Sequence, residues 1–346
     1  MPFTAAELTN IQNAVLDFYL KGDAFDQIKQ DYLLVDALTK RQKTFPGGRG
    51  EIKKNIRGSY TTTMQWYTHD DTATYVNPTS LLQPSFTWKE GHGGINVTLT
   101  ELKKAGISIV DSTSGANTSK HSETEKVEIT DLLTDKTYDM LQGMMRDFNR
   151  TLWSDGTADP KSPPGILSMV TTTPAVGVTG GLNRATYPFW RNRAPPAVVA
   201  TLATAPDQPL TETMEVTWLQ QRRYQGKPTD MFAGSKFIEA YQRERRVKGT
   251  YTQTGFQGKQ DSGMGDLYFK GIEIQYEPTL DELGMDKYCF SLDLKNAIQL
   301  YAMTGEDWKK HAPARPPEKY VMYKAMTWTG ALTAWQLSGC AVFRIA

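Results

Sequence analysis

The segment TGGLNRATYPFWRN, residues 179–192, is the most distinctive stretch of the chain and is called the Gly-Gly segment below. Its two adjacent glycines permit a tight turn, because glycine adopts positive φ at little steric cost. Phe189 and Trp190 follow as large apolar side chains, which stabilise a fold when they are buried. The segment contains no obvious nucleophile, general base or metal ligand. We therefore expect it to have a structural role, with Phe189 and Trp190 as its anchors.

The composition is that of an ordinary globular protein. The 346 residues are 39% hydrophobic and 22% charged, with 39 basic and 38 acidic side chains. No apolar run approaches the roughly 20 residues that cross a bilayer, so we expect no membrane association. Proteins that bind nucleic acid by neutralising phosphates carry a basic excess. Because this chain has none, we do not expect sequence-specific binding to nucleic acid.

The reactive side chains do not form a recognisable active site. Neither GHGGIN (91–96) nor VGVTGG (176–181) fits a phosphate-binding motif. The two cysteines, Cys289 and Cys340, lack metal-ligand spacing and are expected to be buried and apolar. The histidines are scattered along the chain: His69, His92, His121 and His311. We predict no catalytic, cofactor-binding or metal-binding residues and no enzymatic activity, with catalytic groups that converge only in three dimensions as the alternative.

The first hundred residues predict a helix followed by an extended hairpin. Thr4 and Glu7 form a capping box ahead of an apolar helical face. Two long strands are expected around residues 60–100, with a turn at GHGG (91–94). An isolated two-stranded hairpin is marginally stable in water. A long projecting hairpin of this kind predicts a partner that covers it.

A long helix is expected next. Ser122 and Glu125 form a second capping box, and no proline occurs from there to Trp153. Some 30 helical residues would span roughly 45 Å. The apolar positions include several methionines, and we interpret this stripe as a face that packs on a core: Leu133, Met140, Leu141, Met144, Met145, Phe148 and Leu152.

The second half of the chain alternates helices and strands. A helix is expected over residues 211–224, and a short buried strand at Met231 and Phe232 leads into a basic-ended helix. In the last residues the alternating apolar positions change phase between 332 and 335. Such a change predicts a bulge or bend inside one long strand or hairpin.

The Gly-Gly segment resembles a signature of the major capsid proteins of tailed double-stranded-DNA bacteriophages. The matching positions are the two glycines, the arginines, the aromatic residues and Asn192. The order of the expected elements also resembles that family along essentially the whole chain. The same shell fold is shared with encapsulins and the herpesvirus capsid floor.

The resemblance implies an α+β fold with four named parts. These are an N-terminal arm, an extended hairpin called the E-loop, a peripheral (P) domain with a long spine helix, and an axial (A) domain. The implied boundaries are 1–57 for the arm, 58–100 for the E-loop, 101–156 for the P domain, 157–305 for the A domain and 306–346 for returning P-domain strands.

The implied function is that of a structural protein of the virion. It would self-assemble through pentamers and hexamers, in the cytoplasm of the host bacterium, into an icosahedral head that encloses double-stranded DNA without sequence-specific binding. A portal would occupy one vertex, and a decoration protein is a further candidate partner. Only about 55 residues precede the expected hairpin, where some relatives carry a long scaffolding segment. We therefore expect a separate scaffolding protein.

Candidate structural or inter-subunit contacts follow from the same resemblance. Arg184 and Arg191 would make polar contacts within the second lobe or to an adjacent subunit. Some relatives crosslink subunits through a hairpin lysine, and Lys89 lies near the hairpin end. That reaction also needs a buried carboxylate that the sequence does not place, so we do not expect it. The full set of candidates is Arg184, Tyr187, Phe189, Trp190, Arg191, Trp88 and Lys89.

Two main rival functions remain at this stage, and a tail-tube or decoration protein fits the 346-residue length and the long helix less well. An encapsulin-type nanocompartment shell would have the same fold but would hold a cargo enzyme. A β-rich carbohydrate-active protein would use some of the chain's 8 Trp, 16 Tyr and 13 Phe residues as sugar platforms. An encapsulin differs from a phage capsid in its cargo, and a carbohydrate-active protein differs from it in forming only a monomer or small oligomer in solution.

Overall fold

The fold is described from a computed structural model that covers residues 30–48, 50–78, 80–98, 100–101, 123–199, 209–247, 267–312 and 321–346. Contacts divide the chain into two compact units, Met1–Asp31 and Tyr32–Ala346. The elements below belong to the second unit. The expected opening helix with Thr4 and Glu7, and the expected cap at Ser122, lie outside the described residues.

Helices and strands alternate along the second unit. The helices are α2 (Leu33–Thr39), α4 (Glu123–Trp153), α5 (Ile166–Met169), η1 (Pro188–Trp190), α6 (Pro209–Arg222), α7 (Ser235–Val247), α8 (Pro278–Glu282) and η3 (Leu337–Gly339). The strands of the first half are β1 (Lys43–Phe45), β2 (Glu51–Lys53), β3 (Ile56–Arg57), β4 (Leu81–Leu82), β5 (Ser85–Thr87), β6 (Lys89–Thr98), β7 (Val178–Thr179) and β8 (Leu182–Asn183). Those of the second half are β9 (Asp230–Ala233), β10 (Tyr268–Phe269), β11 (Ile272–Tyr276), β12 (Tyr288–Leu292), β13 (Ile298–Met303), β14 (Lys309–Lys310), β15 (Val321–Ala334) and β16 (Ala341–Arg344). The expected mixture of helices and strands is confirmed.

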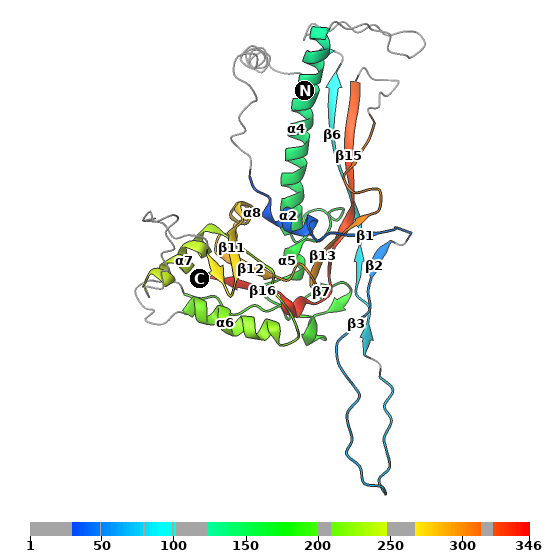
Figure 1. Cartoon of the computed structure of the whole chain (residues 1–346), viewed down its shortest axis with the longest axis vertical. Coiled ribbons are helices and arrows are strands. Elements are labelled where there is room, and N and C mark those ends of the chain that lie inside the picture. The colour runs from blue at the N-terminus through cyan, green and yellow to red at the C-terminus, as the bar shows by residue number, and fades with distance from the viewer. Residues whose placement is uncertain are drawn as a thin grey trace. The chain divides into compact units, whose positions relative to one another are not determined.

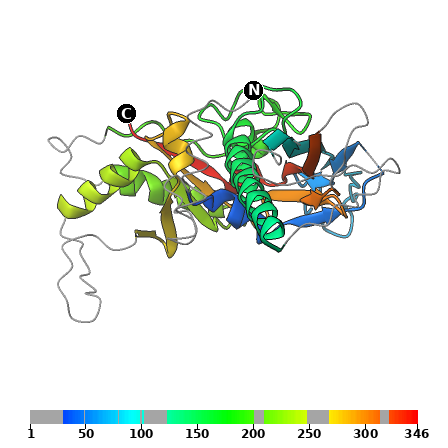
Figure 2. The ribbon, with the colours of Figure 1, turned by 90° about the horizontal axis from the view of Figure 1, so that it is seen from above.

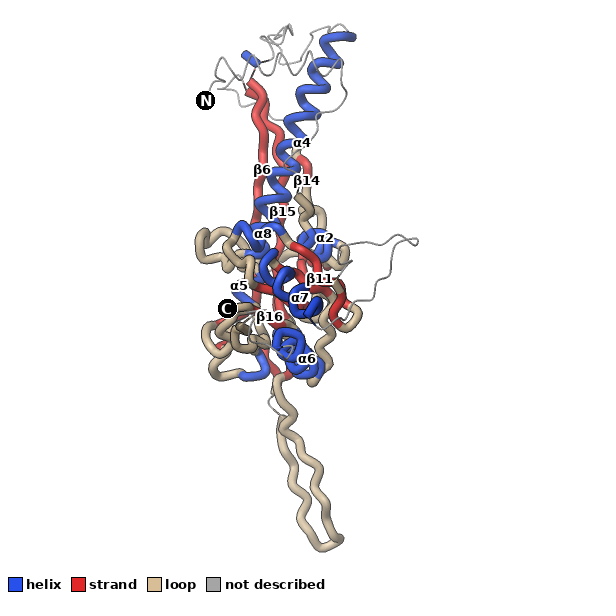
Figure 3. Tube along the Cα trace, turned by 90° about the vertical axis from the view of Figure 1, so that its left-hand side faces the viewer, coloured by secondary structure: helices blue, strands red, loops and turns tan. Residues whose placement is uncertain are grey.

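The long helix α4 packs along a sheet built on β15. In the described residues this sheet has the order β1-β13-β15-β14, and β6 pairs antiparallel with β15 from Lys89 opposite Gly330 to Thr98 opposite Val321. Figures 1 and 3 show α4 running beside β6 and β15. The expected apolar stripe faces this sheet, since the Phe148 ring lies 4.7 Å from the Trp328 ring. The predicted core face is confirmed for the described side chains Met140 and Leu152, which are buried, and for Met144, which lies against Gly93 of β6. The side chain of Leu133 lies outside the description.

The GHGG turn was predicted wrongly. Residues 91–94 lie inside β6 and are paired with β15. A Cβ on Gly93 would lie 2.2 Å from the Met144 sulfur, so the absence of a side chain there admits α4 close to the strand. Glycine allows another element to pack closely on the backbone as well as allowing turns, and the sequence pattern does not distinguish the two uses.

The hairpin also differs from the expected pair of long strands. Its stem is made of two short antiparallel ladders, β2 with β5 and β3 with β4. Beyond the stem, none of residues 58–78, called the hairpin tip, lies in a strand. The tip extends away from the rest of the unit at the bottom of Figures 1 and 3. Neither face of the tip has apolar cover from the described chain, which removes the packing that stabilises a longer ladder.

The second sheet lies next to α6 and α7. Its order among the described strands is β10-β11-β9-β12-β16, with β9 and β11 parallel and the other pairs antiparallel. Figure 2 shows the yellow-green helices α6 and α7 on one side of α4 and the blue strands of the hairpin stem on the other. The helix expected over 211–224 and the strand with a following helix after residue 230 are both confirmed.

The chain changes sheets where the apolar phase changes. β15 ends at Ala334, residues 337–339 form η3, and β16 then joins the second sheet beside β12. The predicted bulge or bend inside one strand is therefore a break between two strands. Each strand presents its apolar side to a different layer, and this explains the shift in phase.

Two hydrophobic clusters hold the unit together. The larger joins α2, the end of α4 and both sheets, and includes Trp153, Trp190 and Phe290. The smaller lies between α6, α7 and the second sheet, and includes Phe237 and Tyr241. Cys289 and Cys340 are buried and free, as expected. Burial raises the pKa of the Cys340 thiol to about 12, so these thiols are not reactive nucleophiles.

Candidate functional site

The Gly-Gly segment begins with a two-residue hairpin turn. β7 and β8 pair across Gly180 and Gly181, whose φ values are 58° and 78°. Positive φ at both central residues is typical of a type I′ turn. The turn contacts the hairpin stem, because Ser85 N donates to Gly180 O at 3.0 Å. A Cβ on Gly180 would lie 2.9 Å from the Phe86 ring, so glycine is needed for this contact.

Arg184 is the centre of the segment's hydrogen bonding. Its side chain is buried with 1% exposure, and its Nε donates to Thr179 Oγ1 at 2.9 Å while Nη1 donates to Thr171 Oγ1 at 2.9 Å. Nη2 donates to the carbonyls of Ser168 and Met169 at 2.6 and 2.8 Å. All these acceptors are neutral, and burial lowers the pKa of the guanidinium. Arg184 thus connects the β7–β8 turn to α5 by hydrogen bonds.

Trp190 and Phe189 are both packed within the unit. Trp190 is 1% exposed, and its Nε1 donates to Thr179 O at 3.0 Å. Phe189 packs on Gly58, where a Cβ would lie 2.3 Å from the ring. The Tyr187 ring meets Phe189 edge-on with centroids 5.8 Å apart. Phe189 therefore packs the start of the hairpin tip against the Gly-Gly segment.

Arg191 and Asn192 complete the segment with contacts inside the unit. Arg191 Nε donates to Arg184 O at 2.6 Å, and its Nη2 donates to Ala185 O at 2.8 Å. Asn192 Nδ2 donates to Thr171 O at 2.8 Å. Of the two kinds of contact expected for Arg184 and Arg191, within the second lobe or to an adjacent subunit, both arginines make the first kind. Their contacts to another subunit stay a prediction.

The other two candidate contact residues, Trp88 and Lys89, lie outside the Gly-Gly segment. Lys89 Nζ donates to Pro160 O at 2.8 Å. Trp88 is half-buried next to it. Lys89 therefore joins the first residue of β6 to the loop that follows α4.

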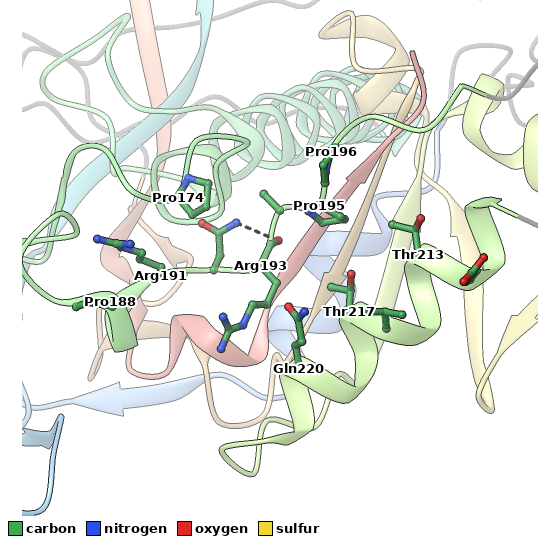
Figure 4. A pocket seen from close by; sticks show the side chains of 13 residues that line it. Pro174, Pro188, Arg191, Arg193, Pro195, Pro196, Thr213, Thr217 and Gln220 are labelled. Atoms are coloured by element: carbon green, nitrogen blue, oxygen red, sulfur yellow. Dashed lines mark hydrogen bonds between the residues drawn. The ribbon is translucent and has the colours of Figure 1, made fainter.

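A groove of about 580 Å³ opens between the end of the Gly-Gly segment and α6. Figure 4 shows Arg191, Arg193 and several prolines on one wall and the α6 side chains Thr213, Thr217 and Gln220 on the other. Glu212 is its one carboxylate. The groove's described lining includes no serine, cysteine, histidine or lysine. Within the part of the chain that the structure describes, no group of three metal-ligating side chains occurs.

Among the described residues, the hairpin tip carries the largest set of exposed large apolar side chains that are close together in the sequence. It turns at Thr68, whose N–H and hydroxyl both donate to Asp71 and lower the pKa of that carboxyl. Five large side chains of the tip are at least 71% exposed: Tyr60, Met64, Trp66, Tyr67 and Tyr75. We did not single these residues out from the sequence. Their density of aromatic residues, in a stretch with polar residues on both faces, is the signal that could have identified them.

Among the described residues, none of the helices has both the length and the apolar character needed to span a membrane. This finding is limited to those residues.

Comparisons with known proteins support one fold. No protein-family model and no curated protein matches the sequence. The capsid asymmetric unit of cyanophage A-1(L) has 13% identity and a TM-score of 0.63, and the match covers 94% of this chain and 96% of that one. The capsid of the empty GTA particle has 8% identity and a TM-score of 0.57, covering 95% and 96% of the two chains. The capsid of Myoviridae phage XM1 has 9% identity and a TM-score of 0.55, covering 94% and 95%.

The matches extend over nearly the full length of both chains in each case. The resemblance first seen in the Gly-Gly segment is therefore confirmed at the level of the fold. The chain has the fold found in these phage and GTA capsids.

Proposed function

We propose that the chain is the major capsid protein of a tailed double-stranded-DNA bacteriophage. It assembles through pentamers and hexamers into the icosahedral head and has a structural role in the virion. The capsid fold along at least 94% of the chain supports this proposal. The near-neutral formal charge of +1 supports it too, because a container for packaged DNA has no need to grip phosphates.

The observation that carries the proposal is the uncovered hairpin tip. Tyr60, Trp66 and Tyr75 are 84%, 85% and 93% exposed. Burying such aromatic side chains is worth about 25 cal/mol for each Å² of apolar surface removed from water. The stem and the Phe189 contact hold the base of the tip, while the described chain leaves its apolar side chains in water. A neighbouring copy that covers the tip would gain this free energy.

Repetition of one such contact builds a shell. A tip that covers a different surface on the next copy makes a heterologous contact, which closes into rings when the rotation fits. We propose fivefold and sixfold rings, and an interface in the obligate class of about 2,000–5,000 Å². The proposed partners are a separate scaffolding protein, a portal at one vertex and a decoration protein. Assembly would take place in the cytoplasm of the host bacterium.

Electron microscopy of the purified chain tests this function. The chain is expressed alone and together with its genomic neighbours, and both preparations are imaged in negative stain. We expect closed angular shells, or rings of five and six copies, in at least the second preparation. Uniform small particles in both preparations would contradict the proposal. Packaged DNA within the shells distinguishes a phage head from a compartment that holds a cargo enzyme.

A further inference from the structure

Glu277 is a fully buried carboxyl group at the junction of three helices. Both Glu277 and Asn149 have 0% exposure. Glu277 directly precedes α8, and its backbone N–H donates to Ala233 O of β9 at 3.1 Å. Asn149 lies near the end of α4, which contacts both α2 and α8. The pair therefore lies where the long helix meets α2 and the second sheet.

The hydrogen bonds of this pair leave one oxygen on each group without a donor. Asn149 Nδ2 donates to Glu277 Oε1 at 2.9 Å and to Thr279 Oγ1 at 2.8 Å. The remaining oxygens, Asn149 Oδ1 and Glu277 Oε2, are buried and have no hydrogen-bond partner. A buried acceptor without a donor costs about 1–3 kcal/mol. One proton shared between these adjoining groups would satisfy both acceptors.

No cation among the described residues compensates a negative charge on Glu277. On the surrounding elements, the ionisable side chains within four residues of Glu277 or Asn149 in the sequence are Arg146, Asp147, Arg150, Glu273, Tyr276 and Asp281. Further along these elements, the described ionisable side chains are Asp36 on α2, Asp230 on β9, Glu282 on α8, and Asp135, Lys136, Tyr138 and Asp139 on α4. In the described part of the chain, Coulomb attraction to a cation is not among the influences on the Glu277 carboxyl. Arg150 is exposed to solvent. Burial has the largest effect on the pKa of the Glu277 carboxyl and raises it. Hydrogen bonds from the Asn149 side chain, from the hydroxyl and backbone N–H of Thr279, and from the backbone N–H of Leu34 act in the opposite direction but do not outweigh burial.

We propose that Glu277 is a neutral carboxylic acid in the folded chain and forms a cyclic pair with the Asn149 amide. A hydroxyl on Oε2 donates to Asn149 Oδ1 while Asn149 Nδ2 donates to Oε1, and the two unpartnered oxygens are then satisfied by one proton. Loss of that proton leaves a buried, unpaired charge facing an amide oxygen. Ionisation of Glu277 therefore loosens the junction of α2, α4 and α8.

The direction of the pH dependence follows from the pKa. Burial raises the pKa of Glu277 above its value in the unfolded chain. The stabilisation is fully present below the unfolded pKa and is lost as the pH rises through the folded pKa. The junction is thus more stable in acid than at neutral pH. This inference concerns the folding of one chain and does not depend on shell formation.

The test compares full-length wild type with Glu277→Gln across the acid to neutral range. Glutamine presents the same acceptor and a donor in place of the acid hydroxyl, but it does not titrate. We expect the unfolding equilibrium constant of the wild type to rise relative to Glu277→Gln by up to tenfold for each pH unit between the unfolded and the folded pKa, and to level off above the folded pKa. Urea unfolding at each pH, with both proteins in the same state of assembly, measures this ratio.

Two further results make the test decisive. Glu282→Gln, an exposed carboxyl on the same helix, serves as the matched control and should follow the wild type at every pH. The infrared band of a protonated carboxylic acid should persist in wild type and Glu282→Gln, above the pH at which exposed glutamates ionise, and should be absent from Glu277→Gln. A wild-type to Glu277→Gln ratio that is constant with pH would overturn the proposal. Failure of Glu277→Gln to fold would also overturn it, because the variant carries the groups that the neutral acid is proposed to use.

Discussion

The Gly-Gly segment and the hairpin tip contain similar residues but have opposite surroundings. Both are irregular and rich in aromatic side chains. In the Gly-Gly segment, Trp190 is 1% exposed and its indole N–H is bonded to a carbonyl. In the hairpin tip, Trp66 is 85% exposed. The first region completes its packing within one chain, and the second leaves its apolar surface in water.

This difference separates residues that fold the subunit from residues that are available to join subunits. Both Arg184 and Phe189 contact parts of the same chain: Arg184 donates to Ser168 O of α5, and Phe189 packs on Gly58 at the base of the hairpin. Substitutions there should change the free energy of unfolding. Substitutions in the tip should leave that free energy unchanged and alter association instead. The predictions below follow the expected change in unfolding free energy from the largest to the smallest.

Trp190→Ala should be the most destabilising of these changes. Removing a buried tryptophan leaves a cavity and typically costs about 3–5 kcal/mol, and here it also removes the donor to Thr179 O. Urea unfolding of the unassembled chain measures the loss. Trp66→Ala is the matched control and should lie within about 0.5 kcal/mol of wild type. Equal stability of the two variants would end the contrast between the regions.

Arg184→Met should follow, with a loss of about 3 kcal/mol. The substitution keeps much of the apolar stem but leaves the buried hydroxyl of Thr179 and the carbonyls of Ser168 and Met169 without their donor. Chemical unfolding again provides the measurement. Arg191→Met, whose side chain is only half-buried, should cost less. The reverse order of the two arginines would show that Arg184 is not the centre of the segment.

Gly93→Ala tests the close packing of α4 on β6 and should cost about 1–3 kcal/mol. The added methyl group would meet the Met144 side chain. Gly91→Ala is the control, because the nearest atom there is at an ordinary 3.8 Å. Gly93→Ala should cost less stability in a Met144→Ala background than in the wild type, because the shorter side chain leaves room for the added methyl group. Simple additivity of the two changes would argue against this contact.

The double variant Trp66→Ser/Tyr75→Ser should have the smallest effect on folding. Both side chains are more than 80% exposed, at 85% and 93%, so the free energy of unfolding should change by less than about 0.5 kcal/mol. Thermal and urea unfolding of the unassembled protein check this. A loss as large as that of Trp190→Ala would mean that the tip is packed within its own chain.

Local patterns in the sequence were sufficient to predict α4, α6, and β9 with α7. Each of these elements is defined by neighbours within one or two turns, such as the apolar spacing that ends at Leu152. The pairing of β6 with β15 was missed because the partners are far apart in the chain, as with Lys89 opposite Gly330. Gly93 was misread for the same reason, since the residue that requires it is Met144 on another element.

The roles within the candidate site were only partly accessible from sequence. Phe189 and Trp190 were expected to be anchors because large aromatic residues gain most from burial. The acceptors of Arg184 on Ser168 and Met169 are backbone carbonyls, which carry no residue-specific signal. The junction of Glu277 with Asn149 was also missed, because a single glutamate before a short helix looks like a surface residue until its burial is known.

Imaging of the tip variant tests the central claim most directly. Wild type, Trp66→Ser/Tyr75→Ser and the control Thr61→Ala/Thr63→Ala, which changes exposed polar residues of the same tip, are prepared under identical assembly conditions and examined by negative-stain electron microscopy. We predict shells or fivefold and sixfold rings for wild type and the threonine control, and folded small particles for the tip variant. Shells of the tip variant in wild-type yield would contradict the claim that the hairpin tip joins subunits.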